Sequence, residues 1–203
     1  MKKLVIASNN KGKIKEIKEI LKDLNIDVFS LKDMNIDIDV EEDGDTFAAN
    51  AKKKAVEIAK VLNEGNDKEF FVLSDDSGLC VDYLNGEPGV YSARYAGEHG
   101  DDKANNKKLL GALDGVKRDR RSGRFVCSMA LVDSNLNCRI VEGSVNGIIL
   151  EKESGEGGFG YDPLFFNEQL EKSFGEATAE EKNKISHRAI ALNKLKELLW
   201  EIL

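Results

Sequence analysis

The chain has 203 residues, of which 41% are hydrophobic and 33% are charged. This length suffices for one well-buried domain or two small lobes, and the hydrophobic share is ordinary for a soluble globular protein, so we expect no extended disorder. The formal net charge of -7 argues against a general nucleic-acid-binding protein, which needs an electropositive surface, but it leaves room for a nucleotide substrate.

The ends of the chain and its cysteines indicate the compartment. The amino terminus lacks an apolar segment of signal-peptide length, and no stretch approaches the length of a membrane span. Cys80, Cys127 and Cys138 are unclustered and odd in number, which argues against a disulfide framework or a zinc site. We therefore expect a cytoplasmic protein with reduced cysteines and no membrane partner.

Strands and helices alternate in the first part of the chain. Apolar runs predict strands, and apolar residues at helical spacing predict helices. In order, we expect a strand over 3–7, a helix over 11–24, a strand over 27–31, an acidic loop over 37–45, a helix over 46–62, a strand over 69–74 and a helix over 101–113.

The second part predicts a hairpin and a closing helix. Long strands over 124–132 and 138–150 are joined by the turn-like Asp133-Ser134-Asn135, which indicates an antiparallel pair. A glycine-rich loop follows over 155–160, and the last helix is expected over 186–202, with 181–188 at its opening. This order favours an α/β or mixed-sheet domain, split into two lobes with a cleft between them.

The most informative motif is the acidic pair Asp75-Asp76, which follows the apolar run of the strand over 69–74. Adjacent carboxylates repel each other, so their place beside a buried strand makes sense if a divalent cation or a proton transfer offsets that cost. The alternative is a polar turn that closes the strand, since Asp, Ser and Gly are ordinary turn residues. The motif alone leaves both interpretations open.

Ser8-Asn9-Asn10-Lys11-Gly12-Lys13 lies where the first strand gives way to the first helix. Backbone amides and lysines at a helix amino terminus can hold phosphate oxygens, although the spacing is not that of a Walker loop. The alternative is a helix-capping loop followed by solvated lysines.

Other polar residues fit the same chemistry. Glu41 and Glu42 read as part of a solvated acidic loop, yet with Asp75 and Asp76 one of them could complete an all-oxygen site for Mg²⁺. Asn50 and Lys54 lie one helical turn apart and form a polar pair.

Two later segments are candidates for binding a base. In Gly157-Gly158-Phe159-Gly160-Tyr161-Asp162-Pro163, glycines allow close approach and Phe159 can stack on a base, unless it is the buried anchor of a turn. His187 and Arg188, which follow Ser186, either have a structural role or offer donors to a phosphate or a carbonyl-bearing base.

Taken together, these blocks resemble the inosine triphosphate pyrophosphatase family, the XTP/dITP diphosphatases. The resemblance extends in order over nearly the whole chain. It is carried by the segments 8–13, 74–79, 88–95, 158–163 and 186–188, by Phe47, Asn50, Ala51, Lys54 and Ala55, and by Lys182. Ser8 stands where many relatives have Thr, and this conservative difference retains the hydroxyl group.

The resemblance implies an elongated α/β fold: a long mixed β-sheet flanked by helices, with two lobes around a central substrate cleft. It implies one nucleoside-triphosphate pyrophosphatase domain over residues 1–203, which works as a homodimer. The implied reaction is Mg²⁺-dependent hydrolysis of dITP, ITP or XTP to the nucleoside monophosphate and pyrophosphate, which removes these nucleotides before they enter DNA or RNA.

Residue roles also follow from the resemblance. Asp76 would be the general base and a metal ligand, and Glu41 the other metal ligand, with Glu42 as its alternative. The residues implied to bind substrate are Ser8, Asn9, Asn10, Lys11, Gly12, Lys13, Asn50, Lys54, Asp75, Ser77, Phe159, Gly160, Tyr161, Asp162, Lys182, His187 and Arg188. Of these, Lys13, Lys54 and Ser77 would serve the phosphates, and the set from Phe159 onward the base and neighbouring groups.

Three alternatives to this function stay open. One is a module that senses altered purine nucleotides without hydrolysing them, and another is an aspartyl-phosphate phosphatase with Asp75 as nucleophile, which releases orthophosphate. The nearest rival within the same chemistry is a pyrimidine-triphosphate or Maf-like pyrophosphatase.

Overall fold

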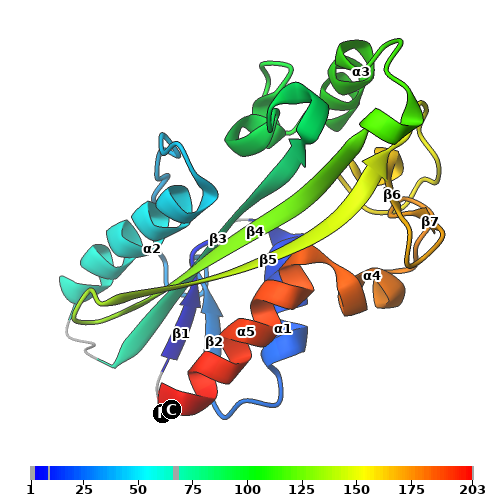
Figure 1. The fold of residues 1–203 in the computed structure, drawn as a ribbon. Coiled ribbons are helices and arrows are strands. Elements are labelled where there is room, and N and C mark those ends of the chain that lie inside the picture. Colours follow the sequence, from blue (N-terminus) through cyan, green and yellow to red (C-terminus); the bar gives the residue numbers. More distant parts are fainter. Residues whose placement is uncertain (1–2, 9, 66–68, 203) are drawn as a thin grey trace. The chain divides into compact units, whose positions relative to one another are not determined.

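The computed structural model describes residues 3–8, 10–65 and 69–202 (Figure 1). Its strands and α-helices are, in order, β1 (Lys3–Ile6), α1 (Lys11–Leu21), β2 (Asp27–Ser30), α2 (Phe47–Asn63), β3 (Phe70–Val81), α3 (Asp102–Ala112), β4 (Ser122–Asp133), β5 (Cys138–Ile149), β6 (Phe165–Asn167), β7 (Lys172–Ser173), α4 (Ala179–Ile185) and α5 (His187–Ile202). Short 3₁₀ helices are η1 (Asp82–Leu84), η2 (Gly89–Arg94), η3 (Arg118–Arg120) and η4 (Asp162–Leu164).

The described strands form one mixed sheet in the order β2-β1-β3-β4-β5-β6-β7, flanked by helices, which confirms the expected α/β class. β1 pairs in parallel with β2 and with β3. β6 pairs antiparallel with β5 on one side and with β7 on the other. β4 and β5 are neighbours joined by a tight turn, in which the Asp133 N–H donates to the Asn137 carbonyl at 3.1 Å. Such a turn makes the two strands antiparallel, as the predicted hairpin requires.

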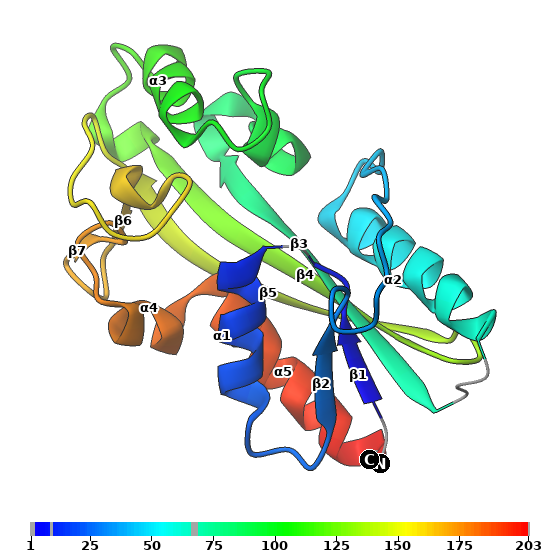
Figure 2. The same ribbon diagram turned by 180° about the vertical axis from the view of Figure 1, so that it is seen from behind.

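The chain divides into two compact units, and the first comprises Met1–Asp76, Cys127–Glu142 and Ala191–Leu203. In this unit strand residues alternate between two apolar clusters. Leu4 and Ile6 pack with α1 and α5, whereas Val5 and Ala7 pack with α2. Because successive strand side chains point to opposite faces, α2 covers one face of these strands and α1 with α5 covers the other (Figures 1 and 2).

The second unit comprises Ser77–Val126 and Gly143–Ile190 and has its own apolar core. Three aromatic rings pack together in this core: the centroid of Phe165 lies 4.5 Å from that of Phe125 and 5.0 Å from that of Phe174. α3 contributes Leu109, which is fully buried. The expectation of a single domain over residues 1–203 stays a prediction.

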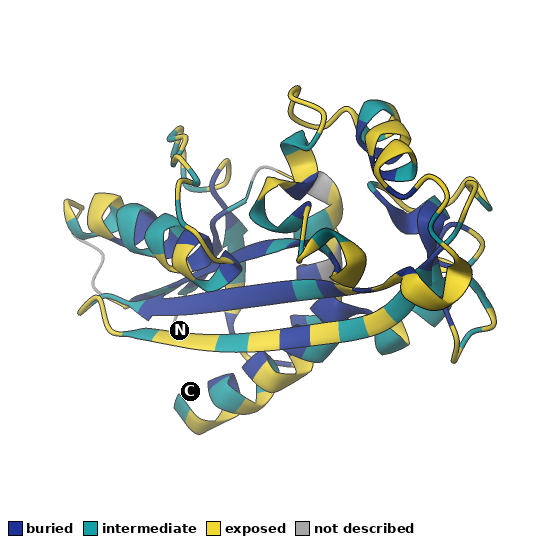
Figure 3. Ribbon diagram, turned by 45° about the horizontal axis from the view of Figure 1, so that its top comes forward, coloured by how far each residue is buried: buried dark blue, intermediate teal, exposed yellow. Residues whose placement is uncertain are grey.

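Burial differs between the two long hairpin strands. β4 is buried along most of its length, whereas β5 alternates between exposed and covered positions (Figure 3). Alternation of exposed and covered side chains along a strand is typical of an antiparallel strand with one solvated face. None of the helices within the described residues combines the length and the apolar composition that crossing a bilayer requires.

Several element boundaries differ from those expected; the helix expected over 11–24, for example, ends at Leu21. The strand expected over 69–74 continues to Val81, so Asp75 and Asp76 lie inside β3 and not in a turn after it. β1 pairs with β3 only as far as Leu73, but β4, of equal length, is the other neighbour of β3 in the sheet. Sheet pairing therefore overrides the turn preference of Asp, Ser and Gly.

The segment over 181–188 does not open a single helix. α4 begins after Thr178, whose side chain forms a capping box with Glu181, and it ends at Ile185, because the next residue, Ser186, has extended backbone angles. α5 starts afresh at His187. Lys182 therefore lies on α4, while His187 and Arg188 occupy the first turn of α5.

Candidate active site

Asp75 and Asp76 point to opposite faces of β3, because successive side chains of a strand alternate. Asp75 faces α1, where its Oδ2 lies 2.9 Å from the Nζ of Lys13. Asp76 faces α2, where its Oδ2 accepts a hydrogen bond from Asn50 Nδ2 at 2.9 Å. The extended backbone thus separates the two carboxylates and gives each a different partner.

The Asp76 carboxylate is held in a buried polar setting. Asp76 and Asn50 are 9% and 1% exposed. Asn50 Oδ1 accepts the Gly44 N–H at 2.7 Å, which fixes which way the amide points. A Cβ at Gly44 would lie 2.7 Å from that same oxygen, so the loop can approach Asn50 only with glycine there.

Burial raises the pKa of Asp76 above its ordinary value of 3.8. The hydrogen bond from Asn50 opposes this shift, the charge of Glu42 adds to it, and the charges of Lys13 and Lys54 lower the pKa again. A carboxylate with a raised pKa is a better proton acceptor than an ordinary aspartate, and a nearby cation favours its ionised form. Asp76 is therefore suited to general-base chemistry.

The loop before α1 caps that helix. Asn10 Oδ1 accepts the Lys13 N–H at 3.1 Å, and Ser8 Oγ accepts the Asn10 N–H at 3.2 Å. The capping alternative is confirmed for Asn10, but Lys13 is not a solvated lysine, because its side chain is 20% exposed and paired with Asp75. Gly12 is exposed. Asn9 and the side chain of Lys11 lie outside the described part of the structure.

Of the two adjacent glutamates, Glu42 faces the Asp76 cluster. Its carboxylate forms an ion pair with Lys54, and its charge acts on Asp76. Glu41 is exposed, and its charge acts on Lys53. Asn50 and Lys54, predicted to share a helix face, are both brought to Asp76 by α2.

The donor set fits a magnesium ion that shares its coordination with substrate and water. No three His, Cys, Asp or Glu side chains within residues 3–8, 10–65 and 69–202 form a metal-binding group. Mg²⁺ in phosphate-transfer sites commonly takes only one or two carboxylates and completes its shell with water and phosphate oxygens. Asp76 and Glu42, whose negative charge raises the pKa of Asp76 further, provide two such carboxylates.

In the second unit, the turn around Phe159 holds that residue's ring in the open. Phe159 is 51% exposed, so it is not the buried anchor of the turn. Asp162, which is 2% exposed, accepts the Phe159 N–H at 2.9 Å. Gly158 has a φ of +76°, and a Cβ there would lie 2.1 Å from Asp162 Oδ2, so this position requires glycine.

Lys182 joins α4 to this turn. Its Nζ lies 2.5 Å from Asp162 Oδ2 and 4.6 Å from the centroid of the Phe159 ring. Tyr161 is buried, and its hydroxyl donates to the Ser92 carbonyl at 2.8 Å. Burial raises the pKa of Tyr161, so its hydroxyl stays protonated and acts as a donor. Four predicted residues, Phe159, Tyr161, Asp162 and Lys182, thus form one connected group.

His187 and Arg188 are both buried at the start of α5, at 5% and 2% exposed. The His187 ring stacks on Phe125 with centroids 4.9 Å apart. Arg188 Nη2 donates to Ser77 Oγ at 3.3 Å, and its Cζ lies 5.9 Å from the Phe159 centroid. The structure therefore brings Arg188 to Ser77 and Phe159.

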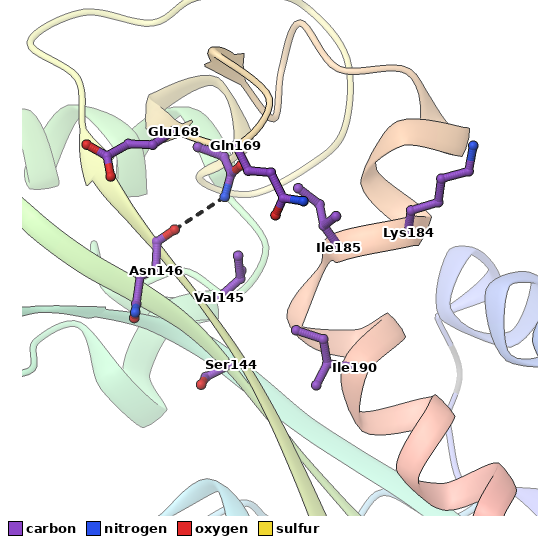
Figure 4. Close-up of a pocket in the computed structure, with 9 residues that line it drawn as sticks. Ser144, Val145, Asn146, Glu168, Gln169, Lys184, Ile185 and Ile190 are labelled. Carbon is purple, nitrogen blue, oxygen red and sulfur yellow. Dashed lines mark hydrogen bonds between the residues drawn. The ribbon is translucent and has the colours of Figure 1, made fainter.

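A separate hollow of about 510 Å³ lies elsewhere in the second unit (Figure 4). Asn146, Gln169, Ile185 and Ile190 are among its lining residues. Two of the lining residues are hydrogen-bonded to each other: the Asn146 carbonyl accepts from Asn167 Nδ2 at 3.3 Å. The hollow contains none of the residues predicted from the sequence to bind substrate.

Sequence reasoning missed three residues that contact the turn around Phe159. Asp102 and Asn106 of α3 hydrogen-bond to Gly160, and Ser92 accepts from Tyr161. In the sequence Asp102 reads as an ordinary acid in the first turn of a helix, and Asn106 has no local signal. Ser92 lies in the segment 88–95 that carried part of the resemblance, but its place there gave no role.

Comparison with known proteins agrees with this picture. The model of the Ham1 family matches residues 4–198. A "dITP/XTP pyrophosphatase" of Clostridium perfringens is 56% identical over 203 residues, covering all of both chains, and one of Bacillus subtilis is 48% identical over 98% of both. The solved structure of the Staphylococcus aureus Ham1 protein superposes with a TM-score of 0.88 at 42% identity, covering all of both chains. The resemblance seen in the sequence is confirmed, and the chain belongs to the Ham1 family.

Proposed function

We propose that this chain hydrolyses the deaminated purine nucleotides dITP, ITP and XTP to the nucleoside monophosphate and pyrophosphate, and so removes them from the nucleotide pool. The observation that carries the proposal is Asp76: a buried carboxylate with a raised pKa, oriented by Asn50 and near two lysines. The names of the full-length relatives, dITP/XTP pyrophosphatases, support the substrate class.

In the proposed reaction, a water oxygen attacks the α-phosphorus and the bond to the pyrophosphate oxygen breaks. Asp76 accepts the proton of the attacking water. Lys13 and Lys54 place positive charge where the phosphate oxygens gain negative charge. Asn50 keeps the Asp76 carboxylate in a fixed orientation, so that proton transfer needs no rearrangement.

The proposed cofactor is Mg²⁺, held by Asp76 and one acid of the Glu41-Glu42 pair. When bound, it neutralises phosphate oxygens and favours the ionised form of Asp76. The charge of Glu42 acts on Asp76 whereas Glu41 is exposed, which favours Glu42 as the second ligand.

For the base, we propose that Phe159 provides a stacking surface and that Arg188 or His187 donates to the 6-oxo group of hypoxanthine or xanthine. Adenine presents a 6-amino group at the same position, which is itself a hydrogen-bond donor. The donors of these side chains would then have no acceptor. A site that relies on buried hydrogen bonds can discriminate by about 10⁴, because the wrong substrate leaves polar groups unpaired.

We also propose, from the resemblance, that the protein acts as a homodimer in the cytoplasm. Light scattering coupled to size-exclusion chromatography tests the dimer. A mass of twice 22.5 kDa is expected, and a monomer at working concentration would contradict it.

The test of the function is a Mg²⁺-dependent assay of dITP, ITP, XTP, dATP, GTP and dUTP that resolves pyrophosphate from orthophosphate. Run in ¹⁸O-labelled water, it should place the label in the nucleoside monophosphate, because attack is at the α-phosphorus. Orthophosphate would indicate a phosphatase, which the burial of Asp75 and its pair with Lys13 disfavour. Tight binding without product would indicate a sensor, and a preference for dUTP would indicate the pyrimidine-directed rival.

A further inference from the structure

Both backbone polar groups of Gly160 are held by side chains of one helix. The Gly160 N–H donates to Asp102 Oδ2 at 2.7 Å, and its carbonyl accepts from Asn106 Nδ2 at 3.2 Å. Asp102 and Asn106 lie four residues apart on α3, so they occupy the same helix face. The helix therefore hydrogen-bonds to the peptide units on both sides of Gly160.

The Asn106 side chain and the helix that carries both residues are themselves held in place. Asn106 is 4% exposed, and its amide also donates to Glu153 Oε1 at 3.0 Å. α3 starts at a capped end, where Asp101 Oδ1 accepts the Ala104 N–H at 3.0 Å. Its Leu109 is fully buried in the core of the second unit. α3 is thus a rigid support for the turn.

The opposite side of the turn is held as well. Asp162 accepts the Phe159 N–H and pairs with Lys182, and Tyr161 donates to the Ser92 carbonyl. The backbone around Phe159 is therefore fixed from both sides, while its ring stays half exposed. Fixing an exposed aromatic ring before a ligand arrives lowers the entropy lost on binding.

We propose that Asp102 and Asn106 are positioning residues that act through Gly160 to hold the Phe159 ring in its base-stacking orientation. This inference rests on the proposed function, because it takes a purine base as the group that meets the ring. It assigns α3 a part in recognising the base, although neither side chain needs to touch the substrate.

The test compares two ligands by calorimetry on the full chain: dIMP, which carries the base, and pyrophosphate, which does not. Asp102→Ala removes the acceptor for Gly160 and should weaken dIMP binding about tenfold, the size of a lost base-stacking contact, with pyrophosphate binding unchanged. Asp102→Asn retains an acceptor oxygen and should restore most of the dIMP affinity. The control Asp101→Ala removes the helix cap but leaves both contacts to Gly160 and the buried Leu109, so it should lower Tm while weakening dIMP binding much less than Asp102→Ala does.

A double-mutant cycle separates positioning from a general structural role. If Asp102 acts through the ring, Asp102→Ala should have little further effect on dIMP binding in a Phe159→Ala background. Additive losses, or equal losses for dIMP and pyrophosphate, would overturn the assignment. If the wild-type protein binds dIMP and the Asp102→Ala variant binds it equally well, this assignment alone is overturned. If the wild-type protein neither binds dIMP nor hydrolyses dITP, the proposed function is overturned and the assignment with it.

Discussion

Asn50 donates a hydrogen bond to the buried carboxylate of Asp76 across 2.9 Å, from α2 to β3. The same amide accepts the Gly44 N–H, so the loop, the helix and the strand meet at one side chain. Because the Asn50 amide is fixed by Gly44, its donor end is directed at Asp76 before any substrate arrives. The Asp76 carboxylate is thus preorganised for proton transfer.

Replacement of Asp76 should abolish most turnover and leave the fold intact. Asp76→Asn keeps the shape and an oxygen that accepts from Asn50, but it cannot take a proton from water. Loss of a general base costs about 10²–10⁴ in kcat. Pyrophosphate release from dITP measures the loss, and circular dichroism checks the fold. A folded variant with near-normal turnover would remove Asp76 from catalysis.

The same substitution should stabilise the protein near neutral pH. Burial raises the folded-state pKa of Asp76, so protonated Asp76 contributes stability that is present below its unfolded pKa and lost as the pH rises through the folded value. Asparagine is neutral throughout. In EDTA, urea unfolding should show Asp76→Asn more stable than wild type at about pH 7, with the difference vanishing on the acid side. A less stable variant at neutral pH would contradict a raised pKa.

Much of the fold was predictable because burial patterns are local. The apolar run of β1 and the helical spacing in α2 reflect which residues are buried, and both elements appear within one residue of their expected ends. The course of β3 through Asp75 and Asp76 was not predictable, because it depends on pairing with a strand far along the chain. The start of α4 had a readable signal in the Thr178–Glu181 capping box, whereas the break at Ser186 had none.

The site was predictable by residue type but not by partner. Asp75 and Asp76 were read as one acidic pair, yet strand alternation gives Asp75 to Lys13 and Asp76 to Asn50. Those partners lie far away in sequence, so no local pattern reports them. Asp102 shows the limit most clearly, since its contact with Gly160 joins residues 58 positions apart.

The two adjacent glutamates should differ in their effect on Mg²⁺. Glu42→Gln removes the charge that acts on Asp76 and should weaken Mg²⁺ binding at least about tenfold, as loss of groups at a metal site commonly does. Glu41→Gln, its matched control, removes an exposed charge and should change little. The rise in Tm with added MgCl₂ reports binding, since a ligand of the folded state stabilises it. A larger effect at Glu41 would make that residue the ligand.

Arg188 should contribute to the choice of base. Arg188→Ala should raise KM for dITP and narrow the preference for dITP over dATP by about tenfold or more, because a donor to the 6-oxo group is lost. Arg188 is 2% exposed, so alanine also leaves a cavity. Arg188→Met fills that space without the donors and should show the same loss of preference. Unchanged selectivity in both variants would remove Arg188 from base recognition.

Two glycines of the turn around Phe159 should differ in their tolerance of a methyl group. At Gly158 a Cβ would lie 2.1 Å from Asp162 Oδ2, whereas at Gly160, with a φ of +62°, it would meet no heavy atom within 4 Å. Gly160→Ala should therefore cost only the left-handed backbone, about 1 kcal/mol.

Gly158→Ala adds a steric clash to the same backbone penalty, so it should cost more than Gly160→Ala, on the order of 3 kcal/mol. Relief of the clash moves Asp162 away from the Phe159 N–H and from Lys182. The KM for dITP should therefore rise more in Gly158→Ala than in Gly160→Ala. Urea unfolding and steady-state kinetics measure the two effects. Equal stability and equal KM for the two alanine variants would mean that the Asp162 side chain can move aside without loss of stability. It would also mean that the contacts of Asp162 do not hold Phe159 in place.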